Sequence, residues 1–225
     1  RQFVPGETIQ SAMDRAAKME AKGYTYSYDM LGEAARTEED ATGYLLSYSR
    51  AITAIAEACK HRQTRDNPGI SVKLSALSPR YEVAQHDEVM NVVVPRLRSL
   101  ALLAKSARMG LNIDAEEADR LALSLDVIET VLSEPALAGW DGFGVVVQAY
   151  GQRASHVIDF VYDLATRLDR RIMVRLVKGA YWDTEVKQAQ VNGIDGFPVF
   201  TSKAATDISY IANARKLLSL TDRLY

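Results

Sequence analysis

Five short apolar runs alternate with long amphipathic segments along this chain. The runs cover residues 24–31, 69–77, 110–117, 142–150 and 171–179, and the amphipathic segments lie near residues 8–20, 37–55, 87–109, 116–133, 153–168 and 203–219. Continuous apolar runs are typical of parallel strands that are covered on both faces, and strands that alternate with helices of this length indicate βα units. The alternation therefore predicts an α/β fold built around a parallel sheet.

Helix boundaries can be placed at several polar or glycine positions. Thr37 precedes three acidic residues, a pattern that predicts an N-cap followed by an acidic first turn. The first helix is expected to start at Thr8. Gly110 is expected to stop the helix near residues 87–109 before the next strand begins.

The parallel sheet can belong to an open, doubly wound fold or to a (β/α)8 barrel. No glycine-rich nucleotide-binding fingerprint follows the first strand, and no phosphate-binding loop motif is present. This favours the barrel, which needs eight strands, whereas the chain shows five and the start of a sixth at "DRLY" (222–225). We therefore expect residues 1–225 to be a single domain, the N-terminal portion of a distorted TIM-like barrel in a longer protein.

Charge and cysteine content argue against several classes of protein. The formal net charge is −2 and the basic residues are scattered, so nothing favours a nucleic-acid partner. The only cysteine, Cys59, excludes an internal disulfide and is typical of a reducing compartment. The histidines are far apart in sequence, so no ligand-spaced pair indicates a metal site. No apolar run reaches the roughly 18 residues of a spanning helix, and we expect a cytoplasmic protein.

Polar side chains recur near the C-terminal ends of four consecutive predicted strands. Because side chains alternate between the two faces of a strand, Lys73, Asp114, Gln148 and Arg175 are expected in one phase. Active sites of βα barrels are built at this end of the strands. A buried, unpaired guanidinium is costly, so Arg175 is expected to face the mouth of the barrel near Asp114. The four residues predict a polar pocket whose charges can pair.

Other interpretations of these residues remain open. Glu116 and Glu117 are expected to form the acidic first turn of a helix. A Mg²⁺ site built from Asp114 and Glu116 would suit a hard cation, but the nearby basic residues argue against it. Lys73 or Lys178 could form a Schiff base in a lyase or aldolase barrel. An incomplete barrel could also be a non-catalytic scaffold, because fold alone does not define function.

Four motifs, in conserved order along the chain, resemble the flavin-dependent proline dehydrogenases. They are "SVKLSALSPRYE" (71–82), "NIDAEEADRL" (112–121), "GVVVQAY" (144–150) and "RLVKGAYWDTE" (175–185). The stretch "GFPVFTSKAATDISYIANARKLL" (196–218) is most similar to the proline dehydrogenase domain of bifunctional bacterial proline-utilization enzymes. The resemblance implies a distorted barrel that oxidises L-proline to Δ1-pyrroline-5-carboxylate by hydride transfer to N5 of FAD, the first step of proline catabolism to glutamate.

The resemblance also implies roles for individual residues. Lys73 would contact the proline carboxylate, and Tyr181 would line the substrate pocket. Asp114 would be the active-site carboxylate, acting either as a base or as an orienting group. Arg175 would lie beside the reactive nitrogen of the flavin. The remaining FAD contacts would come from Gln148, Val177, Lys178, Gly179, Ala180, Trp182, Thr201, Lys203 and Thr206.

The same resemblance implies a quinone as the electron acceptor, peripheral attachment to the inner membrane, and an oligomer as a further option for the full-length protein. In the family, a Thr-His-Asn segment and a terminal helix with adjacent arginines complete the cofactor and substrate sites. Neither is found in these 225 residues. We therefore expect these residues alone not to turn over proline.

Overall fold

The centre of the molecule is a parallel five-stranded sheet with strand order β1-β2-β3-β4-β5. The computed structural model describes residue 4 and residues 6–225. The strands are β1 (Ser27–Asp29), β2 (Gly69–Val72), β3 (Gly110–Ile113), β4 (Phe143–Gln148) and β5 (Met173–Val177). The predicted α/β fold with a parallel sheet is confirmed.

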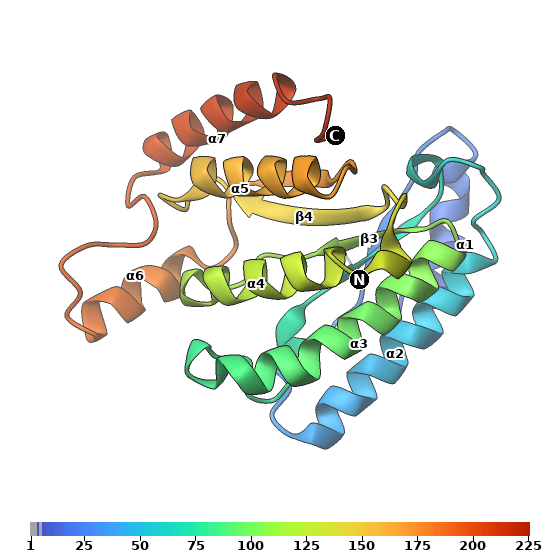
Figure 1. Ribbon diagram of the computed structural model, residues 1–225, viewed down its shortest axis with the longest axis horizontal. Helices are drawn as coiled ribbons and strands as arrows, with labels where there is room; N and C mark the ends of the chain where they lie inside the picture. The colour runs from blue at the N-terminus through green and yellow to red at the C-terminus, as the bar shows by residue number, and fades with distance from the viewer. Residues whose placement is uncertain (1–3, 5) are drawn as a thin grey trace.

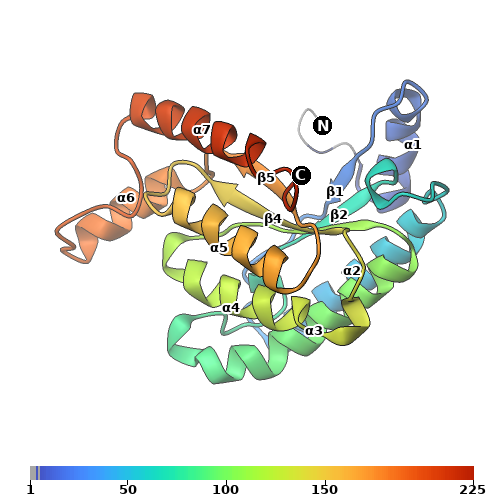
Figure 2. The ribbon, with the colours of Figure 1, turned by 45° about the horizontal axis from the view of Figure 1, so that its top comes forward.

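The strand order distinguishes between the two folds considered for the sheet. Each strand pairs in parallel with the next one in the chain, so every crossover steps in the same direction. Figure 2 shows α2, α3, α4 and α5 together on one face of the sheet. A doubly wound sheet would reverse its strand order and place helices on both faces. The arrangement is therefore that of a barrel wall.

Seven α-helices accompany the sheet in the described part of the chain. They are α1 (Ile9–Glu20), α2 (Glu38–Ala56), α3 (His86–Ser106), α4 (Leu121–Leu132), α5 (Ala154–Arg167), α6 (Trp182–Val191) and α7 (Lys203–Leu218). Short 3-10 turns are η1 (Thr64–Asp66), η2 (Leu74–Ala76), η3 (Val83–Gln85), η4 (Ala118–Arg120) and η5 (Pro135–Leu137). Figure 1 shows α7 beside α5, with α6 projecting from the opposite end of the molecule to α1.

The predicted N-cap at Thr37 and the predicted start of the first helix at Thr8 are confirmed. Thr8 caps α1 through a capping box with Ser11. Thr37 caps α2, where the backbone N–H of Asp40 donates to Oγ1 of Thr37 at 3.1 Å and the N–H of Thr37 donates back to Asp40 Oδ2 at 2.9 Å. Such reciprocal bonds satisfy donors that the helix itself leaves unpaired.

The core lies between the sheet and the helices α2 to α5. Every residue of β2 and β3 is buried, as expected for central parallel strands. Ile70, Val72 and Leu111 are fully buried in one cluster with Val93 and Leu97 of α3. Each such side chain contributes about 1.5–3 kcal/mol through its removal from water. This packing holds the C-terminal ends of the strands at fixed spacing.

Several element boundaries differ from the predictions. Helix α3 ends at Ser106, and the left-handed residue that follows it is Arg108 (φ 56°), so Gly110 does not stop the helix but begins β3. The third predicted strand ends at Ile113, and the second ends at Val72, where the chain enters η2. Helix α6 was not predicted, because it buries only Glu185 and Ala189 and so lacks an apolar stripe.

The chain's last residues lie alongside β5. Leu224 forms a parallel bridge with Ile172, and the N–H of Val174 donates to the carbonyl of Tyr225 at 2.8 Å. The predicted start of a sixth strand is therefore confirmed. It continues the sheet in the direction set by the first five strands.

Candidate active site

Three of the four predicted polar residues are in direct contact. Asp114 follows β3, and its N–H extends the ladder by donating to the carbonyl of Val72 at 3.0 Å. Nζ of Lys73 lies 2.9 Å from Asp114 Oδ2, and Nη1 of Arg175 lies 3.5 Å from Asp114 Oδ1. One carboxylate therefore holds two cations that come from β5 and from the end of β2. The predicted pairing of Arg175 with Asp114 is confirmed.

Sequence reasoning missed three partners of this trio. Asp29, the last residue of β1, lies 3.2 Å from Nζ of Lys73. The fully buried Ser71 accepts a hydrogen bond from Nη2 of Arg175 at 3.1 Å. The N–H of Lys73 donates to Oη of Tyr48 at 3.3 Å, and burial raises the pKa of Tyr48 to about 12. Strand phase placed Ser71 on the same face as Lys73, and a serine facing inward from a strand of Ile and Val was the available signal.

Lys73 remains a cation in this environment. Burial by itself lowers the pKa of Lys73, but hydrogen bonds and charges from Asp114 and Asp29 outweigh it and raise the pKa well above its ordinary value. The side chain is 15% exposed and that of Asp114 is 12% exposed, so water screens the pair only partly. An ammonium group has three N–H donors, and two carboxylates leave one donor for a ligand.

Glu116 was predicted to lie in the first turn of a helix, but the structure places it before the helix. Its carboxylate is buried, and it accepts hydrogen bonds from the N–H of Ser75 at 3.1 Å and from the hydroxyl of Ser75. The turn η4 begins only at Ala118, and Glu117, the other residue of the prediction, pairs with Arg120 at 3.1 Å. Burial raises the pKa of Glu116 despite the bonds from Ser75. The bonds anchor the segment after β3 to the segment after β2.

Gln148, the fourth predicted residue, is tied to the segments on either side of it. Its Nε2 donates to the carbonyl of Glu116 at 2.9 Å, and its Oε1 accepts from the N–H of Ala180 at 3.4 Å. The carboxamide is therefore held in one orientation at the end of β4, and one of its N–H groups has no protein partner among these bonds. The N–H of Tyr150 also donates to the carbonyl of Lys178 at 2.8 Å, which continues the β4–β5 pairing past Val177.

Gly179 occupies a conformation that side chains rarely adopt. Its φ is 135°, and a Cβ at this position would collide with the ring of Tyr150. Both observations require a glycine. The chain can therefore turn sharply after β5 and pass closely over Tyr150.

A second group of predicted residues gathers at the N-terminus of α7. Nζ of Lys178 and Nζ of Lys203 each lie 2.6 Å from a carboxylate oxygen of Asp207. The hydrogen bond with Asp207 raises the pKa of Lys178. Ser202 caps the helix without a side-chain hydrogen bond. Two lysines, one carboxylate and a helix N-terminus leave net positive charge at this point.

The predicted aromatic and hydroxyl residues fall into two groups by exposure. Trp182 is 40% exposed and its Nε1 donates to the carbonyl of Phe200 at 2.9 Å, which ties the start of α6 to the segment before α7. Thr201 is exposed, whereas Thr206 is buried on α7. Tyr181 is half-buried, and burial raises its pKa. The side chain of Trp182 is therefore partly accessible at the start of α6.

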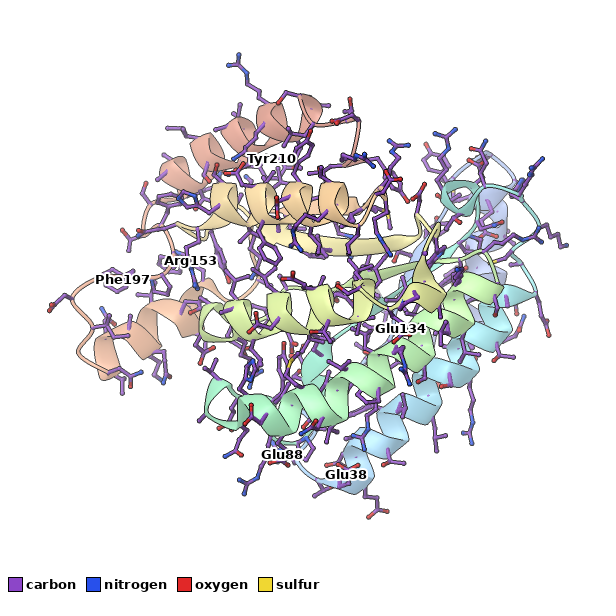
Figure 3. The ribbon with its side chains drawn as sticks, viewed as in Figure 1. Glu38, Glu88, Glu134, Arg153, Phe197 and Tyr210 are labelled. Atoms are coloured by element: carbon purple, nitrogen blue, oxygen red, sulfur yellow. The ribbon has the colours of Figure 1, made fainter. Side chains whose placement is uncertain are left out.

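Helix α6 is fastened to the segment that carries Asp114 and Glu116. The buried carboxylate of Glu185 accepts a hydrogen bond from the N–H of Ala118 at 2.6 Å. Figure 3 shows Arg153 at the start of α5, beside the ends of α4 and α6, and its Nη2 donates to the carbonyl of Ala118 at 2.6 Å. These bonds give the segment two further anchors on elements that lie outside the sheet.

The donor set has the chemistry that a flavin dinucleotide requires. Arg175 and Gln148 offer N–H donors at the strand ends, where the electron-poor ring would need them. Lys178, Lys203 and the N-terminus of α7 match a pyrophosphate, which binds to helix N-termini and to cations. Trp182 offers a face for stacking. Within the described residues, no group of three or more His, Cys, Asp and Glu side chains is arranged to bind a metal ion. None of the helices in this part of the chain has the length and the apolar composition of a membrane-spanning helix.

Comparisons with known proteins identify the family to which this chain is similar. Residues 12–225 match the family model for proline dehydrogenase. The chain is 57% identical over 224 residues to the bifunctional protein PutA of Escherichia coli (strain K12), and the match covers 100% of this chain and 17% of that protein. It is 30% identical over 181 residues to proline dehydrogenase 1 of Bacillus subtilis (strain 168), covering 80% of this chain and 52% of that protein.

Solved structures give the same result for the fold. Proline utilization A of Bradyrhizobium japonicum matches with a TM-score of 0.90 and 54% identity, over 99% of this chain and 23% of that one. Proline utilization A of Bdellovibrio bacteriovorus, inactivated by N-propargylglycine, matches with a TM-score of 0.91 and 30% identity, over 99% and 24%. The chain thus spans about a fifth of the length of these bifunctional relatives.

Proposed function

The chain belongs to the proline dehydrogenase family, and we propose that it supplies the flavin-binding side and part of the substrate-binding side of an enzyme that oxidises L-proline to Δ1-pyrroline-5-carboxylate. The observation that carries this proposal is the trio in which Asp114 holds both Lys73 and Arg175 at the ends of neighbouring strands. The trio offers one cation to a substrate carboxylate and one to a cofactor.

Lys73 binds the carboxylate of proline in this proposal. Its ammonium stays charged, and the third N–H donor is free after Asp29 and Asp114 have taken the other two. A fixed ammonium recognises a carboxylate as a point charge. Tyr181, half-buried directly before α6, would line the pocket beside it.

Asp114 acts as an orienting group and not as a base. Its Oδ2 faces Lys73 and its Oδ1 faces Arg175, so both oxygens already accept from cations. The two ion pairs fix the distance between the substrate-binding lysine and the cofactor-binding arginine. Such preorganisation removes part of the entropic cost of bringing the reactants together.

FAD is the cofactor that this donor set is proposed to hold. Arg175 and Gln148 would contact the ring, Val177 to Ala180 would follow the chain of the cofactor, and Lys178 and Lys203 would neutralise its phosphates. Trp182 would pack on the adenosine half, with Thr201 and Thr206 nearby. When bound, the flavin supplies the two-electron acceptor for the hydride that leaves proline.

The rival Schiff-base mechanism fits the two lysines poorly. A Schiff-base lysine must be a neutral amine, and this requires a lowered pKa. Contacts with carboxylates instead raise the pKa of both Lys73 and Lys178. A bare scaffold does not account for the trio either, because it gives no reason to hold two cations on one buried carboxylate.

The proposal also covers the wider setting of the reaction. We propose that electrons pass from the flavin to a quinone and that the protein associates peripherally with a membrane to reach it. We also propose a second catalytic activity in the same polypeptide, because the PutA relatives are described as bifunctional.

The absorbance of the purified full-length protein tests the cofactor and the substrate together. Addition of L-proline without oxygen should bleach the flavin band, and dithionite should bleach it to the same extent. An Arg175→Ala variant should lose flavin, while Arg171→Ala, which changes an arginine two residues before β5 begins, should retain it. A colourless protein, or borohydride trapping of a carbonyl compound on Lys73, would overturn the proposal.

A further inference from the structure

Ser71 is a polar residue in a position where strands normally carry apolar ones. It lies in β2 between Ile70 and Val72, and none of its surface is exposed. A buried hydroxyl without a partner is costly, so its hydrogen bonds need to be accounted for. Nη2 of Arg175 donates to Ser71 Oγ at 3.1 Å, across a separation of 104 residues in the chain.

The chemistry of the two groups fixes the direction of the bond between Arg175 and Ser71. A guanidinium carries only donors, so Ser71 Oγ accepts from Arg175 and keeps its own proton. Ser27 Oγ on β1 lies 3.2 Å from Ser71 Oγ, and either hydroxyl of this pair can donate the hydrogen bond. Ser71 therefore connects the arginine of β5 with the first strand of the sheet.

Arg175 has two anchors in the described part of the chain. Nη1 reaches Asp114 at 3.5 Å, at the limit of a hydrogen bond, whereas Nη2 reaches Ser71 at 3.1 Å. Two anchors on different terminal nitrogens define the plane of the guanidinium, and one anchor would leave it free to rotate. The shorter bond is the one with Ser71, although Asp114 carries the charge.

The residues beside Ser71 in the sheet are tightly packed. Ser71 lies opposite Asn112 in the β2–β3 register, and Asn112 lies opposite Gly144 in the β3–β4 register. A Cβ on Gly144 would collide with the amide of Asn112, so this layer has no spare space. Packed interiors of this kind hold a side chain in one position.

We infer that Ser71 is a positioning residue that sets the plane of the Arg175 guanidinium against the reactive end of the flavin. The inference rests on the proposed function and deepens it. Arg175 lies in the strand and points to the mouth, whereas Ser71 lies beneath it and touches no ligand. The position of the guanidinium determines how strongly it stabilises negative charge on the reduced ring.

The test uses the purified holoenzyme with Ser71→Ala and, as a second variant of nearly equal volume, Ser71→Cys, whose thiol is a weak acceptor. Loss of one hydrogen bond to a charged group should slow flavin reduction by proline roughly tenfold. The KM for proline should change less than about twofold, because Lys73 holds the carboxylate. The flavin midpoint potential should become more negative in both variants. Ser78→Ala removes another buried serine hydroxyl and should change neither the rate of flavin reduction nor the midpoint potential.

A double-mutant cycle with Arg175→Lys separates positioning from general support of the fold. If Ser71 acts through the guanidinium, Ser71→Ala should have a much smaller effect in the Arg175→Lys background. Equal effects in both backgrounds, or values for Ser71→Ala and Ser71→Cys that match Ser78→Ala, would overturn the inference while leaving the function intact. A wild-type protein that binds no flavin would overturn both.

Discussion

Asp114→Asn is the substitution that most directly tests the trio. The amide that replaces the carboxylate has one acceptor and one donor, whereas Lys73 and Arg175 both offer only donors. Whichever way the amide turns, its NH₂ group must face one of the two cations. The variant therefore loses the charge that holds both cations and introduces a donor-to-donor contact at a side chain that is only 12% exposed.

The expected cost follows from the distances. At 2.9 Å the Lys73–Asp114 pair gains about 6 kcal/mol at an effective dielectric constant of ~20, and most of that gain offsets the cost of removing the charges from water. Lys73 keeps Asp29 at 3.2 Å, so it does not become an unpaired cation. The remaining loss is that of a charge-assisted hydrogen bond, and we expect the free energy of unfolding to fall by about 2–3 kcal/mol.

Urea unfolding followed by circular dichroism measures this loss, and Asp29→Asn provides the matched control. Asp29 binds the same lysine at a similar distance but its side chain is 54% exposed, so its loss should cost less than about 1 kcal/mol. Equal losses for the two variants, or a loss below about 1 kcal/mol for Asp114→Asn, would refute the conclusion that Lys73 is held more strongly by Asp114 than by Asp29.

The pH dependence gives a second measurement on the same variant. The folded pKa of Lys73 lies above its ordinary value of 10.5, so the stability it contributes is complete below that pH and is lost as the pH rises through the folded value. The difference in stability between the wild type and Asp114→Asn should therefore shrink above pH 10.5. A difference that stays constant into strong alkali would contradict this.

Three further substitutions probe neighbouring features. Gly179→Ala should lower the free energy of unfolding by more than about 2 kcal/mol, because φ is 135° and the new Cβ would collide with the ring of Tyr150. Gly193→Ala should lower it by about 1 kcal/mol, because φ is 62° and nothing lies within 4 Å of the new Cβ. Equal shifts in thermal midpoint for the two variants would contradict this. Glu116→Gln removes a carboxylate whose pKa is raised by burial, so the stability that the wild-type residue contributes is present below pH 4.5 and is lost above it. In urea unfolding, the free energy of unfolding of the variant should therefore rise relative to that of the wild type from pH 4 to pH 8. A constant difference would exclude a raised pKa. Trp182→Leu should cost less than about 1 kcal/mol of stability, because the ring is 40% exposed, yet should lower the flavin content of the purified protein several-fold; full flavin content would place the adenosine half elsewhere.

Hydrophobic periodicity and helix caps located most of the elements. The buried strands β2, β3 and β4 were visible as apolar runs, and Thr8 and Thr37 marked the first residues of two helices. Helix α6 escaped because its ten residues are mostly polar and bury only two side chains. A short helix of that kind is stabilised by anchors such as the bond between Glu185 and Ala118, 67 residues apart, which no local pattern reveals.

The candidate site was predicted in the same uneven way. Strand phase placed Lys73, Asp114, Gln148 and Arg175 at one end of the sheet, and the structure brings three of them into contact. Glu116 was assigned to a helix terminus from the acidic stretch around it. Only the turn of the chain after β3 shows that its carboxylate is buried against Ser75.

The order of residues determined by itself where each strand lies and which face each polar side chain takes, because alternation along a strand is a local property of the backbone. Tertiary structure alone decided which of these side chains meet. The contacts of Lys73 with Asp29 and of Arg175 with Ser71 depend on the lateral register of strands that are 44 and 104 residues apart. A shift of one residue in that register would turn one partner to the opposite face, and packing of the whole core selects the register that is observed.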